Sequence, residues 1–295
     1  LNGLPTDEVQ KIFQDREGFI WFATRYGLCK YDGYQVTVYK SNLYAPGLLT
    51  SNNIYCLADD YDGNLWIGTQ EGLNVLNKKT GEIRQYTYPA IPNNAVSCLS
   101  VTKDNKVWVG TDSGLCRYVP QKDSFVVYGD NMDDGAFTIS AIKSLLEDAD
   151  GDLWVGTWSG GLFRHSLKED KFYAYPRINE RNSAHVIYQD ADHKIWVGGW
   201  DCGLFLLNHS KDMEKVSYTR YVHKVGDETS LSDNIVYDIV EDVHTHTLWI
   251  GTRAGLSIMK RETPGQFINY KSRHSSYYIS CDEINSLLRD RANNI

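Results

Sequence analysis

The sequence lacks the features of a membrane segment, a disulfide scaffold and a nucleic-acid-binding domain. No apolar run approaches the roughly 18 residues that a membrane-spanning helix needs. Six cysteines among 295 residues are too sparse for a network of disulfides. Basic residues are in the minority, with 30 Lys and Arg against 38 Asp and Glu. Because phosphate binding needs a basic face, the net charge of −8 argues against nucleic acid as a partner.

Targeting signals are missing as well. The chain starts at Leu1 without a methionine and carries neither a signal peptide nor a lipidation motif. We therefore expect a mature or excised piece of a larger protein. The composition, 42% hydrophobic and 13% aromatic, is typical of a soluble globular protein. A chain of this length buries roughly three quarters of its unfolded surface, so its core needs neither metal nor disulfide.

Tryptophan marks an internal repeat. Six of the eight tryptophans stand in a recurring frame, Trp-(Ile/Val)-Gly-Thr followed by Gly-Leu, of which two copies are looser. They are Trp21, Trp66, Trp108, Trp154, Trp196 and Trp249. A period of about 40 to 50 residues with several short strands is typical of a propeller. Each repeat divides into four strands, and no segment shows sustained helical periodicity. The sequence therefore predicts an all-β fold, a β-propeller of four-stranded blades, with residues 1–295 as a single domain.

A turn precedes each repeat tryptophan. Its frame is Asp-x-(Asp/Glu)-Gly-x-(Leu/Ile)-Trp, as at Asp148 to Trp154. Glycine accepts the positive φ of a hairpin tip, and the aspartate carboxylate can accept hydrogen bonds from turn amides. Asn105 and His193 replace this glycine in two copies, and both residue types tolerate that conformation. We expect each tryptophan to pack between neighbouring sheets and the glycine two residues later to allow close approach.

The C-terminal residues repeat the start of the frame. Asp290 to Ile295 read as a seventh turn and stop where the next tryptophan would stand. The sequence thus holds six repeats plus the first strand of a seventh. We predict an incomplete seven-bladed ring, with a closed six-bladed ring as the alternative.

The sequence of the repeat resembles that of a known family. The run Asp-x-x-Gly-x-Leu-Trp-Ile-Gly-Thr-x-x-Gly-Leu, seen at Asp60 to Leu73, resembles the two-component regulator propeller repeat. That repeat builds periplasmic sensor regions of hybrid two-component systems, in which two seven-bladed propellers precede a β-sandwich, a membrane helix, a kinase and a response regulator. The resemblance implies a periplasmic module that senses an oligosaccharide and regulates kinase activity and glycan-utilisation genes. It also implies a homodimer, a second propeller and β-sandwich in the same protein, and membrane attachment only through a downstream helix.

Two tryptophans fall outside the repeat frame. Trp158 and Trp200 each stand four residues after a repeat tryptophan, in loops one residue longer than in other copies. Loops between second and third strands share a propeller face with the connections between blades. We therefore expect the two rings to stack on sugar, with Asp201 accepting hydrogen bonds from hydroxyls. The alternative is that both pack locally or against a partner propeller.

Further candidates stand in the corresponding loops of other repeats. Arg25, Tyr26 and Arg253 are among them, and the two arginines could pair a uronate or sulfate bidentately. The alternative for each arginine is solvated rim charge. Cys202, in the same loop as Trp200, is expected to be exposed.

Catalytic motifs are weak throughout. The sequence has no nucleophile elbow and no P-loop, and its aspartates stand at repeated turn positions. His244 and His246 fall in a lengthened turn that reads as a plain loop rather than a metal site. We expect neither metal nor cofactor, and no enzyme activity in this chain, although the full-length protein would be a histidine kinase. The alternatives are a propeller lyase or hydrolase related to streptogramin lyases, and a protein-interaction propeller.

Overall fold

The fold is built almost entirely of β-strands. The computed structural model describes residues 3–42, 48–129, 140–178, 181–272 and 279–295, and within them the strands form six four-stranded sheets. The chain divides into two compact units, Leu1–Glu147 and Asp148–Ile295, which are described separately. The predicted all-β fold with four-stranded blades is therefore confirmed, while its assignment to a single domain stays a prediction.

Each sheet takes four consecutive strands, and we number these blades in chain order. In the first unit, blade 1 contains β1 (Val9–Gln14), β2 (Ile20–Thr24), β3 (Gly27–Tyr31) and β4 (Val36–Tyr39); blade 2 contains β5 (Ile54–Asp59), β6 (Asn64–Thr69), β7 (Gly72–Asn77) and β8 (Ile83–Tyr86); blade 3 contains β9 (Val96–Val101), β10 (Val107–Thr111), β11 (Gly114–Val119) and β12 (Ser124–Tyr128). A single turn of 3₁₀-helix, η1 (Pro120–Lys122), follows β11.

The boundary between the units falls within the fourth sheet. Blade 4 contains β13 (Ile142–Glu147), β14 (Leu153–Thr157), β15 (Leu162–Ser166) and β16 (Lys171–Ala174); blade 5 contains β17 (Val186–Gln189), β18 (Ile195–Gly198), β19 (Leu204–Asn208) and β20 (Ser217–Tyr221); blade 6 contains β21 (Val236–Asp242), β22 (Thr247–Thr252), β23 (Gly255–Lys260) and β24 (Phe267–Tyr270).

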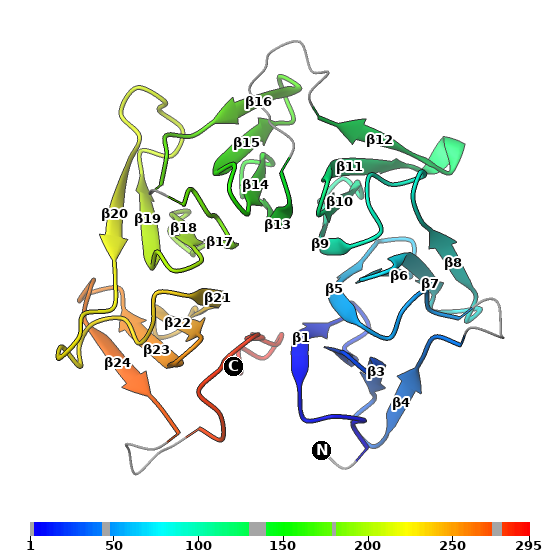
Figure 1. Cartoon of the computed structure of the whole chain (residues 1–295), viewed down its shortest axis with the longest axis horizontal. Coiled ribbons are helices and arrows are strands. Elements are labelled where there is room, and N and C mark those ends of the chain that lie inside the picture. Colours follow the sequence, from blue (N-terminus) through cyan, green and yellow to red (C-terminus); the bar gives the residue numbers. More distant parts are fainter. Residues whose placement is uncertain (1–2, 43–47, 130–139, 179–180, 273–278) are drawn as a thin grey trace. The chain divides into compact units, whose positions relative to one another are not determined.

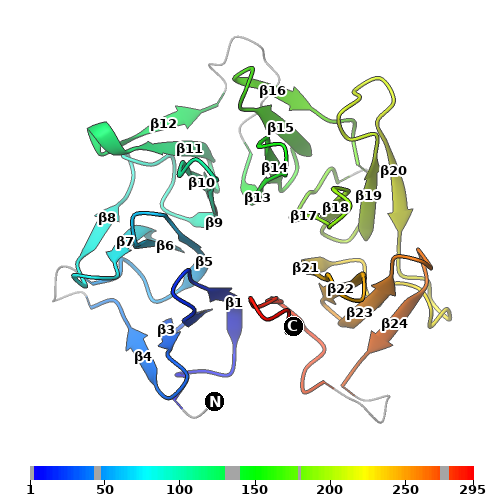
Figure 2. The same cartoon turned by 180° about the vertical axis from the view of Figure 1, so that it is seen from behind.

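Within each unit the blades stand side by side. In the first unit the first strands β1, β5 and β9 lie close together, and the fourth strands β4, β8 and β12 lie apart (Figure 1 and, from behind, Figure 2). Burial follows this order, because β6 is buried from its second residue onward whereas β4 is largely exposed. The core therefore lies between the inner strands of adjacent blades.

The repeat tryptophans fill the space between blades. Trp21 of blade 1 packs with Ile54 and Ile67 of blade 2, and Trp66 of blade 2 packs with Val96 and other residues of blade 3. Trp196 packs in the same way against blade 6. Five of the six are at most 3% exposed, and Trp249 is half-buried. The predicted packing between neighbouring sheets is confirmed for Trp21, Trp66 and Trp196.

The turn aspartate holds its tryptophan directly. Asp60 Oδ1 accepts hydrogen bonds from the amides of Asp62 and Asn64, and Oδ2 accepts one from Trp66 Nε1 at 2.8 Å. The same arrangement recurs in blades 1, 4 and 5, where Asp15, Asp148 and Asp190 each bond the indole of their own tryptophan. One carboxylate thus folds the turn and orients the largest core side chain.

Glycine two residues after the tryptophan allows the next blade to approach. A Cβ on Gly68 would lie 2.3 Å from Cys56 Sγ and 2.8 Å from the carbonyl oxygen of Val96 in blade 3. A Cβ on Gly198 would lie 2.6 Å from Val236 Cγ1 in blade 6. Only glycine fits these positions without moving backbone or buried side chains.

The prediction of an incomplete seven-bladed ring is wrong. The described strands make six blades, and no strand follows β24 in residues 279–295. The predicted turn does form, since Asp290 Oδ1 accepts hydrogen bonds from the amides of Ala292 and Asn294. The segment before it lies along blade 6 instead, where the Ile284 amide bonds Thr252 O. A strand needs a pairing partner, and the blade count agrees with the six-blade alternative.

Candidate functional site

Two loops of the second unit bring Trp158 and Trp200 into contact. Trp158 lies between β14 and β15, and Trp200 lies between β18 and β19. Their ring centroids are 5.1 Å apart with planes inclined by 52°. Trp158 is 40% exposed and Trp200 is half-buried. The structure thus joins the two tryptophans that lie outside the repeat frame into one partly open aromatic corner.

Two further aromatic rings complete this corner. His185 lies 6.2 Å from Trp158 and 5.7 Å from Trp200, between centroids, and Tyr237 lies 6.1 Å from Trp200 and 6.2 Å from His185. We call Trp158, His185, Trp200 and Tyr237 the aromatic cluster. Blades 4, 5 and 6 all contribute to it, so its shape depends on how adjacent blades pack.

Backbone hydrogen bonds fix the cluster from beneath. The Ala184 amide donates to Thr157 O at 2.9 Å, and the His185 amide donates to Gly198 O at 2.8 Å. Ala184 and His185 therefore tie this segment to the ends of both tryptophan strands, β14 and β18. In the next loop Asp201 has φ +58°, which aspartate tolerates in tight turns. These bonds place the rings before any ligand arrives, which lowers the ordering cost of binding.

Charged side chains pair with Tyr237 and with Asp201, the residue that follows Trp200. The Tyr237 hydroxyl donates a hydrogen bond to Glu283 Oε1 at 3.0 Å. Burial and this bond raise the pKa of Tyr237 to about 12, so the hydroxyl stays protonated at neutral pH. Asp201 pairs with Arg181 at 3.0 Å, and both side chains are about half exposed. This rim offers donors and acceptors around an apolar surface, the usual composition of a small-molecule site.

The other predicted residues are less closely associated with the cluster. Arg253 pairs with Asp233 at 3.1 Å, in the blade that carries Tyr237. Arg25 and Tyr26 lie in the first unit, where Arg25 pairs with Glu8 at 3.3 Å and Tyr26 is 58% exposed. Cys202 is buried, so the expectation of an exposed thiol there is wrong. It lies under the loop because its thiol packs toward Ser183 O.

Sequence reasoning missed His185 and Tyr237. His185 directly precedes β17, and Tyr237 is the second residue of β21. Both stand where a first strand begins, at the same end of the blade as the tryptophan loops. Their place at the start of a first strand is the sequence signal that could have identified them.

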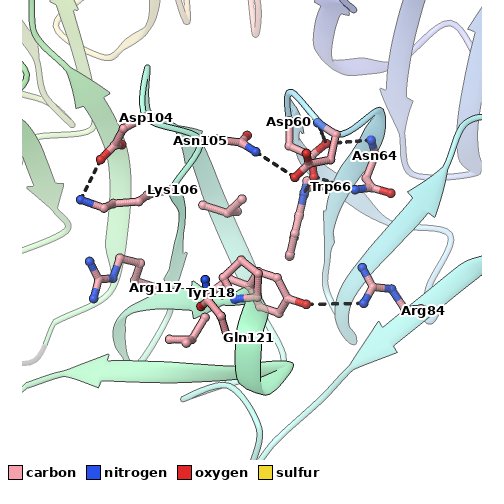
Figure 3. Close-up of a pocket in the computed structure, with 14 residues that line it drawn as sticks. Asp60, Asn64, Trp66, Arg84, Asp104, Asn105, Lys106, Arg117, Tyr118 and Gln121 are labelled. Carbon is pink, nitrogen blue, oxygen red and sulfur yellow. Dashed lines mark hydrogen bonds and ion pairs between the residues drawn. The ribbon is translucent and has the colours of Figure 1, made fainter.

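A cavity of about 420 Å³ lies between blades 2 and 3 of the first unit. Asp60, Asn64 and Trp66 line one side, and Asp104, Lys106 and Arg117 line the other (Figure 3). Tyr118 and Arg84 close the bottom of this view, joined by a hydrogen bond of 3.4 Å. The lining is strongly polar with two aromatic rings, and no sequence motif pointed to it.

Neither a metal site nor a membrane helix emerges in the described parts of the chain. Among those residues no three His, Cys, Asp or Glu side chains cluster closely enough to hold a metal ion. No helix within them reaches the length and hydropathy of a membrane span.

Comparison with known proteins identifies the repeat. Four segments, residues 3–26, 48–71, 90–113 and 137–159, match the model of the two component regulator propeller. The chain thus carries two-component regulator propeller repeats, and the resemblance predicted from Asp60 to Leu73 is confirmed. The comparison with curated proteins finds no significant match.

Solved structures agree with this assignment. The extracellular domain of the hybrid two component system BT3049 from B. thetaiotaomicron is 26% identical, with a TM-score of 0.80. The alignment covers 99% of this chain and 38% of that one, so the chain spans well under half of its relative. The extracellular domain of the hybrid two component system BT4673 is 20% identical, with a TM-score of 0.57 over 99% of this chain and 49% of that one.

A lyase shares the fold as well. Virginiamycin B lyase from Staphylococcus aureus is 17% identical, with a TM-score of 0.56 over 75% of this chain and 70% of that one. At this identity the likeness shows the fold alone.

Proposed function

We propose that this chain, which carries two-component regulator propeller repeats, is the extracytoplasmic sensor module of a hybrid two-component signalling protein. In this proposal it is periplasmic and non-enzymatic, and it works as a homodimer together with a second propeller and a β-sandwich of the same protein. The signal would pass through a downstream membrane helix to a histidine kinase that regulates glycan-utilisation genes. The resemblance to extracellular domains of such systems supports this role.

The ligand in this proposal is an oligosaccharide bound at the aromatic cluster. Aromatic faces stack on the apolar faces of sugar rings, and the contacting rings of Trp158 and Trp200 offer a sugar ring a surface to lie across. Asp201 and Arg181 provide an acceptor and a donor for hydroxyl groups at the rim. The contact between Trp158 and Trp200 is the observation that carries the proposal, because two residues outside the repeat frame converge there.

Binding must favour one arrangement of the sensor to transmit a signal. A ligand shifts such an equilibrium only by its differential affinity for the two arrangements. The cluster draws on three blades of the second unit. A sugar held by it therefore contacts several blades at once and responds to changes in their packing.

Tryptophan fluorescence provides the test. The chain is titrated with a panel of plant and host oligosaccharides, and a saturable change with one glycan class is expected. That change should disappear in the Trp158→Ala/Trp200→Ala variant and persist in Tyr34→Ala, which removes an aromatic side chain that is 98% exposed in the first unit. Equal affinity in the double variant would exclude the cluster as the site. Absence of binding to every glycan, also by a chain that includes the remaining sensor region, would refute the oligosaccharide proposal.

A further inference from the structure

A basic side chain bridges neighbouring blades at the turn that carries the aspartate. Lys78, directly after β7 of blade 2, lies 3.5 Å from Asp15 and 3.3 Å from Glu17 in the turn of blade 1. Its Nζ also lies 3.0 Å from Asp59, in its own blade. The Lys78 side chain is only 4% exposed. The ammonium group therefore bridges two buried carboxylates and one half-exposed carboxylate between the two blades.

The second unit repeats this arrangement twice. Lys211 of blade 5 reaches the turn of blade 4, where its Nζ lies 2.5 Å from Asp148 and 2.9 Å from Asp152. Arg261, directly after β23 of blade 6, pairs with Asp192 in the turn of blade 5 and with Glu241 of its own blade. In three grooves, then, a cation from one blade occupies the acidic turn of the blade before it.

Blade 3 lacks both the bridging cation and the carboxylate of its own blade that the cation contacts. Pro120 directly follows β11 and so stands at the position of Lys78 and Arg261. Lys78 also donates its amide to Gly63 O at 3.2 Å, and proline has no amide hydrogen for such a bond. Val101 pairs with Val107, the residue before Trp108, just as Asp59 pairs with Leu65 in blade 2. Val101 therefore occupies the position of Asp59. The groove between blades 2 and 3 therefore contains neither the bridging cation nor its own-blade carboxylate.

The cavity of about 420 Å³ occupies this groove. Asp60 and Asp62 line it from blade 2, and Asp60 is only 4% exposed. Among the residues that the structure describes, no basic side chain forms an ion pair with either. Lys106 pairs with Asp104 at 2.7 Å, and Arg84 lies 3.3 Å from Asp123. Buried Asp60 and exposed Asp62 thus face a space that a lysine or arginine fills in the other three grooves, and the basic residue Arg117 lines the same space.

Amides satisfy hydrogen bonds at these carboxylates without neutralising them. Asn64 Nδ2 donates to Asp60 Oδ2 at 2.8 Å, and Asn105 Nδ2 donates to Asp62 Oδ2 at 2.9 Å. An amide supplies a hydrogen bond but no positive charge. A cation that enters the cavity consequently gains the attraction of both carboxylates, and such charge-assisted bonds are the stronger kind.

We propose that the cavity between blades 2 and 3 binds the ammonium group of a small organic amine at Asp60 and Asp62. The ammonium would take the place that Lys78 and Lys211 Nζ hold in the other grooves. The remainder of the ligand would lie against Trp66 and Tyr118, whose rings line the cavity and favour a cation or an alkyl chain beside them. A volume of this size holds a molecule as large as a monosaccharide or a diamine.

The indole N–H of Trp66 is a built-in reporter of this site. It bonds Asp60 Oδ2, just as the indole of Trp21 bonds Asp15 Oδ2 in the groove that Lys78 fills. The experiment follows the tryptophan indole signals of the ¹⁵N-labelled chain by NMR while n-butylamine, which has the shape and charge of a lysine side chain, is added. A fragment of this size is expected to bind with a Kd on the order of 1 mM.

The expected result is a saturable shift of the Trp66 signal with unchanged Trp21 and Trp154 signals. The neutral analogue 1-butanol should produce no such shift. Asp62→Asn should weaken n-butylamine binding by about two- to fivefold, because the lost ion pair is at an exposed carboxylate whose charge is screened by solvent. Glu71→Gln, which removes an exposed carboxylate in the β6–β7 loop of the same blade, should bind as the parent does.

Pro120→Lys tests the comparison between grooves directly. The new ammonium should fill the cavity, abolish n-butylamine binding and raise the unfolding temperature. If this variant does not fold, Asp62→Asn decides alone. The proposal is overturned if Trp66 responds no more than Trp21, if 1-butanol acts equally, or if Asp62→Asn binds normally. A response of Trp66 to Ca²⁺ but not to n-butylamine would also overturn it, in favour of a metal site.

Discussion

Removal of the Lys78 ammonium should destabilise the first unit strongly. Lys78→Met keeps most of the aliphatic stem, which packs between blades, and deletes the charge. Asp15 is fully buried and Asp59 is 5% exposed, so both carboxylates would remain in the interior without their cation. Breaking a buried ion pair in this way costs about 3–5 kcal/mol. Glu17 adds little to that figure because half of its side chain is exposed.

Lys211 provides a graded comparison for this effect. It makes a similar set of contacts with Asp148 and Asp152, but its side chain is 38% exposed. Solvent screens such a pair, so Lys211→Met should cost about 1–2 kcal/mol, between the surface and buried limits. The difference between the two variants isolates burial, because the chemistry of both substitutions is the same.

Urea unfolding followed by tryptophan fluorescence and circular dichroism measures both losses. Lys79→Met, at the exposed neighbour of Lys78, is the control and should change the free energy of unfolding by less than about 0.5 kcal/mol. A loss below about 1 kcal/mol for Lys78→Met would refute the assignment of a buried bridging charge. Burial lowers the pKa of Lys78, but the hydrogen bonds and negative charges of Asp59, Asp15 and Glu17 together outweigh this, and the net pKa lies above the ordinary 10.5. Its stabilisation should therefore be complete below that pH and fall as the pH rises further.

Two further predictions concern glycine and pH. Gly68→Ala should cost about 3 kcal/mol or more, because its Cβ would collide with Cys56 Sγ and with Val96 O. Gly63→Ala, with open space around it and φ +86°, should cost about 1–2 kcal/mol, and thermal unfolding compares the two variants. Burial raises the pKa of Asp148, but the hydrogen bonds from Lys211 and Trp154 and the charge of Lys211 together outweigh this, so the net pKa lies below its ordinary value. Asp148 thus stabilises the fold above about pH 4 and loses this effect as the pH falls, so Lys211→Met should flatten the acid limb of a stability–pH curve.

The blade architecture could be predicted because each repeated residue has a local task. The turn carboxylate binds amides two and four residues away, and the tryptophan six residues away. The glycine after it admits the next strand. Such short-range requirements appear directly in the spacing of the sequence. They recur in every copy with small exceptions, such as Thr102 in place of the aspartate in blade 3.

The blade count could not be derived from the same local signals. Asp290 forms its turn through bonds to Ala292 and Asn294, just as the repeat frame predicts. A turn needs only its own residues, whereas a strand needs a partner to pair with. The segment after Asp282 instead bonds blade 6, including Asp238 and Thr252, and remains without strand pairing. The number of repeat copies in the sequence therefore predicts the number of turns but not the number of sheets.

The aromatic cluster shows the same division between local and distant signals. Trp158 and Trp200 could be singled out because they depart from the repeat within their own loops. Their contact with each other, and the additions of His185 and Tyr237, arise from the packing of three adjacent blades. No spacing in one repeat encodes such a neighbour in the next.

The groove between blades 2 and 3 extends this reasoning from structure to function. The copies within a repeat protein can be compared with one another, because equivalent positions have equivalent surroundings. Where Lys78 and Arg261 fill a groove, the same position in blade 3 is Pro120, and the acidic turn that faces it is retained. If a cation at the position of Pro120 served stability alone, we would expect a blade without it to lack the facing carboxylates Asp60 and Asp62 as well. Retention of Asp60 is required by its own turn and by Trp66, but Asp62 has no such local obligation. The response of Asp62→Asn to an added amine therefore separates a binding site from a cavity left by an absent lysine.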